Sequence, residues 1–413
     1  MKNLLKNHGL LLFWICLMLS TYIGYSEEVI IVFALVFCIM RKRLNIGFIN
    51  RNLMFIIFFT YCFFLTLIGS IIGFAEIKSI FKFIVEYVLL VYCVSSCLFF
   101  DKTEGILSLL DIRNMICISA IYGTVETILK YNPLTNIVST VNWLNSMNAL
   151  TYRYQPSSIY LHYTYYAFFL LIGFIILLKF PFKKKLINIG AYILIIEQLF
   201  FSKSRMGWIT FVLILFFYWV IVNKKGKIKK RYLYSIFILI IVFFIVISVK
   251  PELVRDINSV IINRFASFKI YGMRDGSLGQ RWGTLLNYPK YLKEYPLQAF
   301  VGTGSETINN VFLREFSYFV GYDTADNQYL TILIETGIIG FFMFCIALLL
   351  WFRKFFHRND NLSVTCKLMC TMFAIQGIAY NLTSYFQFVM IVFIFFLWER
   401  NKQVEKNNQN RQL

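Results

Sequence analysis

The sequence is poor in charge and in histidine. Charged residues make up 15% of its 413 positions and there are three histidines, whereas 59% of the residues are hydrophobic and 19% are aromatic. The mean hydropathy is +0.65, and this composition excludes a soluble globular protein. Apolar runs near or above the length needed to cross a bilayer recur along the whole chain, so we expect a polytopic membrane protein.

The cysteines lack the spacing of a metal site or a redox motif. No C-x-x-C pair and no cluster of cysteine with histidine occurs, so neither a disulfide framework nor a zinc site is supported. We interpret the cysteines as small buried packing residues, because all nine fall within predicted membrane spans: Cys16, Cys38, Cys62, Cys93, Cys97, Cys117, Cys345, Cys366 and Cys370.

The apolar N-terminal segment lacks a small-residue cleavage site, and further spans follow it directly. We therefore expect a retained first helix and not a signal peptide. The hydrophobic runs predict an all-α fold with about twelve transmembrane helices, at residues 9–26, 28–40, 53–74, 79–100, 106–129, 161–180, 186–203, 205–222, 231–249, 329–352, 365–382 and 385–398.

Lysine and arginine are scarce in every second short turn. The alternate turns, such as "RKRLNIGFINR" and "NKKGKIKKR", carry nearly all of these residues, so the positive-inside rule places both termini in the cytoplasm. The net charge of +20 reflects mostly this bias and attraction to membrane lipid, and no nucleic acid partner is needed to explain it. The expected parts are nine spans in 1–249, a large extracytoplasmic loop in 250–328, three spans in 329–398 and a cytoplasmic tail in 399–413.

The large outer loop is too aromatic and too weakly charged for a disordered segment. We expect it to fold as short helices on the membrane surface, for instance around 281–294. Trp282, Leu285, Leu286 and Tyr288 would press this helix against the bilayer.

Two arginines at the outer face are candidates for binding a phosphate. Arg205 begins the eighth span, and Arg281 lies on the first turn of the expected loop helix. A guanidinium binds phosphate bidentately, although an interfacial anchor for Arg205 and a solvated side chain for Arg281 are equally ordinary. Arg153 precedes the sixth span on the same face, and His162 follows within an aromatic belt that favours a structural role.

The stretch "TADNQYLTILIETGIIG" leads from the loop into the tenth span. Asp326 is placed to cap that helix, or to act as a general base at the outer surface. Asn327, Thr331 and Glu335 line one face of the helix, and a structural hydrogen bond is the favoured role for Glu335. Upstream, Gly302 and Gly304 could bring backbone amides close to an anion, although a plain turn is the simpler interpretation.

Three segments in this order resemble the bacterial O-antigen polymerases and O-antigen ligases. "SKSRMGW" is similar to the family's Ser-x-Ser-Arg segment, and "GQRWGTLLNYPKYLKEYPLQAFVGTG" to its Arg-led segment that ends in Gly-x-Gly. "DNQYLTILIETGIIG" is similar to the run before the span that follows the large loop. The layout of about twelve spans with cytoplasmic termini, like that of GT-C glycosyltransferases, agrees with this resemblance over most of the chain.

The resemblance implies a metal-independent glycosyltransferase without a cofactor, in the bacterial plasma membrane with an extracytoplasmic active site. Its substrates would be undecaprenyl-diphosphate-linked oligosaccharides, and a chain-length regulator protein is a further expected partner. Arg205 and Arg281 match the two arginines that hold the donor diphosphate. The expected substrate contacts are Arg153, Trp282, Gly302, Gly304 and Asn327.

Asp326 stands where the ligases of the family carry a histidine. This difference favours a polymerase, with Asp326 beside Arg205 and Arg281 as the catalytic set, over a ligase that transfers finished polymer to a lipid A core. A transporter of the same lipid-linked sugars is a third possibility. It is disfavoured because the sequence shows no internal repeat and most of the telling charge lies outside the membrane.

Overall fold

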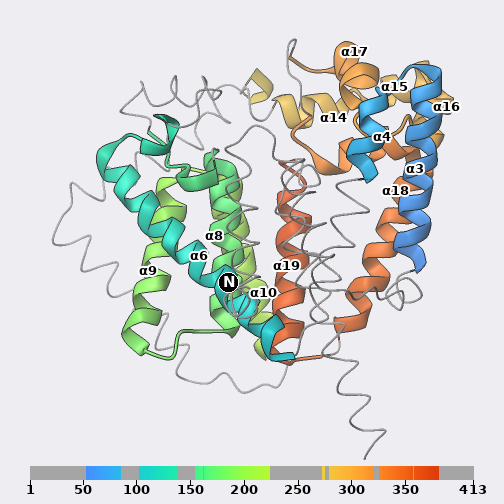
Figure 1. Cartoon of the computed structure of the whole chain (residues 1–413). Helices are drawn as coiled ribbons and strands as arrows, with labels where there is room; N and C mark the ends of the chain where they lie inside the picture. The colour runs from blue at the N-terminus through green and yellow to red at the C-terminus, as the bar shows by residue number, and fades with distance from the viewer. Residues whose placement is uncertain are drawn as a thin grey trace, which may run out of the picture.

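The computed structural model of the chain describes residues 53–84, 102–136, 154–160, 162–223, 272–274, 279–319, 325–356 and 358–380. Every regular element within these ranges is a helix (Figure 1), which agrees with the predicted all-α fold class. The predicted spans 9–26, 28–40, 231–249 and 385–398, the tail and Arg153 lie outside the described residues.

The long helices follow the predicted spans closely. They are α3 (Leu53–Ile72), α6 (Lys102–Leu129), α8 (Tyr163–Lys179), α9 (Lys185–Phe201), α10 (Arg205–Asn223), α18 (Gln328–Phe356) and α19 (Asn361–Gln376). The short α4 (Ile77–Phe83) covers the described beginning of the span predicted at 79–100. The eleventh span was placed too late, because α19 begins at Asn361 and ends at Gln376 and not at 382.

Length and composition mark one described helix, Gln328–Leu350, as sufficient by itself to cross a membrane. Three shorter apolar stretches accompany it, Ile56–Ile72, Tyr163–Lys179 and Arg205–Ile221. The count of twelve spans therefore stays a prediction.

Helix α8 lies at the centre of one group of helices. All of its side chains from Tyr166 to Leu177 are buried, and a helix that is apolar all round is expected inside a bundle. Helices α6, α9, α10 and α19 pack against it. In Figure 1, α3 and α18 stand together on the other side of α19.

Arg113, a charged residue inside α6, has polar and aromatic partners at the end of α8. Arg113 is buried, donates a hydrogen bond from Nη1 to the Phe180 carbonyl at 2.5 Å, and lies 3.7 Å from the ring centroid of Phe182. The guanidinium thus holds the turn after α8 against α6. The segment predicted as a span at 106–129 forms part of one continuous helix despite its arginine.

The outer loop forms short helices at one end of the molecule (Figure 1): α14 (Thr284–Leu286), α15 (Tyr288–Glu294), α16 (Pro296–Val301) and α17 (Arg314–Phe316). Leu285 and Tyr288 pack inward against a cluster centred on Tyr291, which is fully buried. Trp282 is 46% exposed and Leu286 67% exposed. The expectation that all four apolar side chains of the first loop helix face the membrane was therefore wrong for Leu285 and Tyr288.

A break in α18 receives the end of the loop. Gly337 has φ 66° and ψ −179°, so the helix is interrupted there. The amides of Thr303 and Gly304 donate to the Glu335 carbonyl at 3.1 and 2.9 Å, and Gly302 has φ 101°. We call the contact of residues 302–304 with residues 335–337 the loop joint.

Helix α3 closes the loop joint from the other side. The Tyr61 hydroxyl donates to the Val301 carbonyl at 2.5 Å, and the Ser305 amide donates to Thr66 Oγ1 at 2.9 Å. A Cβ at Gly69 would collide with the Thr303 carbonyl. The loop is therefore fixed to two helices through backbone contacts that tolerate no side chain at several positions.

Alanine at Gly302 or Gly337 should detach the loop. An added Cβ at either residue would overlap the other's backbone, and both residues have positive φ. Gly73 is the matched control, because it has φ 90° with nothing near a Cβ. We expect Gly73→Ala to lower the free energy of unfolding by about 1 kcal/mol, and each alanine at the joint by about 2 kcal/mol more. Unfolding in detergent measures this difference, and equal losses at all three glycines would contradict the joint.

Candidate functional site

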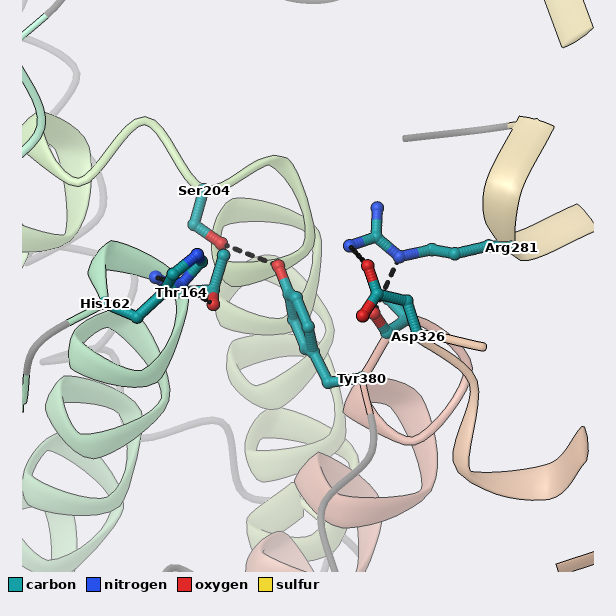
Figure 2. A network of polar contacts seen from close by, with 7 residues as sticks. His162, Thr164, Ser204, Arg281, Asp326 and Tyr380 are labelled. Atoms are coloured by element: carbon teal, nitrogen blue, oxygen red, sulfur yellow. Dashed lines mark hydrogen bonds and ion pairs between the residues drawn. The ribbon is translucent and has the colours of Figure 1, made fainter. Parts of the chain in front are cut away.

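Two of the three predicted motifs meet at the end of α19. Arg281 donates from Nε to the Ala379 carbonyl at 2.7 Å, and its Nη2 lies 3.3 Å from Asp326 Oδ2 (Figure 2). The guanidinium also lies 5.2 Å from the ring centroid of Tyr380. The structure therefore brings Arg281 and Asp326 together. It adds two contacts to Arg281 that the sequence did not indicate, from Ala379 and Tyr380.

The third motif, in the turn between α9 and α10, contacts Tyr380. Ser202 Oγ donates to the Leu199 carbonyl at 2.7 Å, and Ser204 Oγ accepts from the Gly207 amide at 3.2 Å as the cap of α10. Ser204 Oγ also lies 3.3 Å from the Tyr380 hydroxyl (Figure 2). The serines of this motif thus build the turn, and Arg205 is placed as the first residue of α10.

The end of α19 is tied firmly to α10 and α18. Gln376 Nε2 donates to Thr210 Oγ1 at 2.7 Å and to the Met206 carbonyl at 3.2 Å. The Gln328 amide, at the start of α18, donates to the Gly377 carbonyl at 2.8 Å. These bonds place the starts of α10 and α18 and the end of α19 at the same end of the molecule as the loop.

Asp326 is not the helix cap. Asn327 Oδ1 accepts from the amides of Tyr329 and Leu330 at 3.0 and 3.1 Å, so Asn327 caps α18. Asp326 precedes the cap with φ 47°, and its carboxylate turns to Arg281. Both residues are good caps in sequence, and the fold assigns the cap to the second. Asn327 is 4% exposed and its amide oxygen serves the helix.

The glycines expected to cradle an anion serve the loop joint. The Gly302 amide donates to the Gln298 carbonyl at 2.7 Å, and the amide of Gly304 donates to the Glu335 carbonyl. These bonds favour the interpretation of the Gly-x-Gly segment as a turn. Trp282, which directly follows Arg281 in the same helical turn, is exposed.

Glu335 also belongs to the joint. Its Oε1 accepts from the Glu306 amide at 2.9 Å, and Glu306 forms an ion pair with Lys82 of α4 at 3.0 Å. The carboxylate inside α18 thus binds the outer loop, which agrees with the structural role favoured from the sequence. Thr331, one turn earlier, donates to the Asn327 carbonyl at 3.0 Å.

His162 lies at the start of α8, across Tyr380 from Arg281 in Figure 2. Its Nδ1 accepts from the Thr164 amide at 3.2 Å and contacts Thr164 Oγ1, so it caps the helix. This is the structural role that its aromatic surroundings favour.

A buried carboxylate that the sequence did not single out holds the segment before α8. Glu126 of α6 accepts from the amides of Ser157 and Ser158 at 2.9 and 2.6 Å, and from the Tyr154 hydroxyl at 2.5 Å. Burial, and then the charge of Glu126, raise the pKa of Tyr154 above its usual value. The segment that precedes His162 is therefore held against α6.

The site combines a cation, Arg281, with a carboxylate, Asp326, just before the start of α18. Among the described residues no group of histidine, cysteine, aspartate and glutamate could hold a metal ion. The arrangement can bind an anion through the guanidinium and accept a proton on the carboxylate.

A comparison with known proteins identifies this region. Residues 190–345 match the model of a protein family described as O-antigen ligase. The matched segment includes Arg205, Arg281 and Asp326, and it confirms the resemblance drawn from the motifs. None of the curated proteins with which the sequence was compared matches it.

The cap assignment separates the two neighbouring residues experimentally. Asn327→Ala should lower the free energy of unfolding by about 1 kcal/mol, because two amides of α18 lose their acceptor. Asp326→Asn should leave this free energy nearly unchanged, because asparagine tolerates positive φ and the ion pair is partly exposed. Unfolding of both variants in detergent tests this, and an unchanged free energy of unfolding for Asn327→Ala would show that Asn327 is not the cap.

Proposed function

We propose that this chain, as a protein of the O-antigen ligase and polymerase superfamily, is a polysaccharide repeat-unit polymerase for O-antigen or capsule. Enzymes of this superfamily are glycosyltransferases of the bacterial inner membrane. The observation that carries the proposal is the pairing of Arg281 with Asp326, the residue that replaces the ligase histidine. We place the site on the extracytoplasmic face, with both termini in the cytoplasm.

The donor is a growing glycan linked to undecaprenyl diphosphate, and Arg281 and Arg205 bind its diphosphate. Arg205 occupies the first position of α10, where the partial positive charge of the helix end makes a cation unfavourable unless an anion is present. The helix end and the guanidinium together attract the diphosphate. Trp282 offers an exposed face on which a sugar can stack.

The acceptor is the terminal sugar of another lipid-linked repeat unit. Its hydroxyl oxygen attacks the anomeric carbon of the donor, the bond from that carbon to the diphosphate oxygen breaks, and the configuration inverts. Asp326 takes the hydroxyl proton, and the arginines neutralise the charge that develops on the departing oxygen. Diphosphate is a good leaving group, so no metal ion is required.

The ion pair couples these two roles. It is partly open to solvent, with 16% of the Arg281 side chain and 36% of the Asp326 side chain exposed, and such pairs contribute little stability. An incoming diphosphate can therefore replace the carboxylate as the partner of Arg281. The displaced carboxylate then stands beside the reacting carbon.

A ligase is the alternative, because the family match does not separate the two activities. It would transfer finished polymer to a lipid A core and would use Asp326 as a base where its relatives use histidine. A transporter of lipid-linked sugars is less favoured, because the sequence shows no internal repeat. A chain-length regulator remains an expected partner of a polymerase.

Surface polysaccharide length in the host tests the reaction. A strain in which the gene is deleted should carry a single repeat unit, and wild-type protein should restore the full ladder whereas Arg205→Ala should not, because the diphosphate loses one cation. Gel electrophoresis of extracted polysaccharide, with protein levels matched, makes the measurement. Full-length polymer that accumulates on its lipid carrier in the deletion strain would instead establish the ligase.

Lysine cannot replace Arg281 in this mechanism. Arg281→Lys keeps the charge but loses the planar fork and the Nε bond to Ala379, so the rate of polymer formation should fall on the order of 100-fold. Arg314→Lys, at an exposed position of the same loop, is the control. Wild-type activity should persist in EDTA, since the arginines and not a divalent cation neutralise the leaving group. Unchanged activity of Arg281→Lys would remove this residue from the site.

A further inference from the structure

Tyr380 touches two of the three parts of the site with one side chain. Its ring faces the Arg281 guanidinium at 5.2 Å, and its hydroxyl lies 3.3 Å from Ser204 Oγ, the cap of α10 (Figure 2). Tyr380 is 8% exposed, so both contacts are largely shielded from water. We infer that Tyr380 is a positioning residue that holds Arg281 in register with the start of α10, and this inference rests on the proposed function.

The backbone of Tyr380 is itself well fixed. The amides of Ala379 and Tyr380 donate to the Gln376 carbonyl at 2.9 and 3.0 Å, and the Gln376 side chain is bonded to α10. The carbonyl of Ala379 accepts from Arg281. Ala379 and Tyr380, in the turn after α19, are therefore held firmly to α10. Their contacts with Arg281 oppose any displacement of the loop relative to α10.

A neutral aromatic ring suits this role better than a charged partner. Asp326 also holds Arg281, but its negative charge competes with a diphosphate for the same guanidinium. The ring attracts the cation through its quadrupole and does not itself take any of its N–H groups as a hydrogen-bond partner. Arg281 can thus exchange Asp326 for a diphosphate while it keeps its contacts with the Tyr380 ring and the Ala379 carbonyl.

A residue that links the loop to α10 is needed because the two arginines of the proposed site come from separate segments. Arg281 belongs to the outer loop, whereas Arg205 begins α10, and a diphosphate must meet both cations at one separation. The loop is anchored at the loop joint, on α3 and α18. Tyr380 supplies a second anchor at the α10 side, through Ser204.

The test is a double-mutant cycle on the full-length protein in lipid nanodiscs. Tyr380→Leu and Tyr380→Phe are each made alone and with Arg281→Ala. The measurements are the dissociation constant for undecaprenyl diphosphate and the initial rate of polymer formation from lipid-linked repeat units extracted from the deletion strain. Thermal unfolding of every variant controls for folding.

Tyr380→Leu should weaken undecaprenyl diphosphate binding about tenfold, and Tyr380→Phe should weaken it less, because the ring stays against Arg281 while the hydroxyl contact with Ser204 is lost. In the Arg281→Ala background, Tyr380→Leu should cause no further loss, since there is no cation left to position. Full additivity of the two losses, or wild-type affinity of Tyr380→Leu, would overturn the inference.

A series of phenylalanine analogues at position 380 with increasing ring fluorination covers the case in which Tyr380→Leu does not fold. Fluorination withdraws the negative charge from the ring face at nearly constant shape, so affinity should fall stepwise with each fluorine, whereas a merely structural ring would give a constant affinity. If wild type binds undecaprenyl diphosphate without making polymer, the proposed polymerase fails and the cycle still decides the role of Tyr380. If wild type does not bind it, both proposals are wrong.

Discussion

The described part of the outer loop is anchored on α18 by the backbone carbonyl of Glu335. In an unbroken α-helix this oxygen would accept the amide four residues ahead, and the loop would have no backbone partner on α18. The break at Gly337 turns the oxygen to the amides of Thr303 and Gly304. Because both sides of the contact are main chain, the loop is held close and at a fixed angle, and the aromatic cluster around Tyr291 is carried on that anchor.

The same short stretch of helix also sets the position of the carboxylate. The part of α18 before the break begins at Gln328, directly after Asn327 and Asp326, and ends at the loop joint. One rigid element of a few turns therefore places Asp326 at its start and the loop at its end. Arg281, from the loop, pairs with Asp326. The loop therefore contacts this part of α18 at both of its ends, through the ion pair at the start and through the loop joint at the break.

Periodicity was sufficient for most of the long helices that the structure describes, and motif order was sufficient for Arg281 and Asp326, which meet. Apolar runs marked the long helices to within a few residues, because burial in a bundle demands them, and the three motifs contained Arg205, Arg281 and Asp326. The roles within the motifs were harder. Asp326 and Asn327 are equivalent caps in sequence, and only the register of α18 against Gly377 decides between them. Tyr380 carried no signal, since an aromatic residue inside an apolar span is ordinary until the arginine above it is placed.

The Gly-x-Gly segment shows why local chemistry alone misleads here. Glycines near an arginine are compatible with an anion cradle, but a cradle needs amides that point away from their own fold. Those of Gly302 and Gly304 are bonded to carbonyls, and the close approach that glycine permits is used against α18 and α3. Anion binding in the proposed mechanism must therefore come from side chains and from the start of α10. In that proposal the diphosphate is bound by Arg281 and Arg205, and Tyr380 contacts both Arg281 and Ser204, the residue before Arg205.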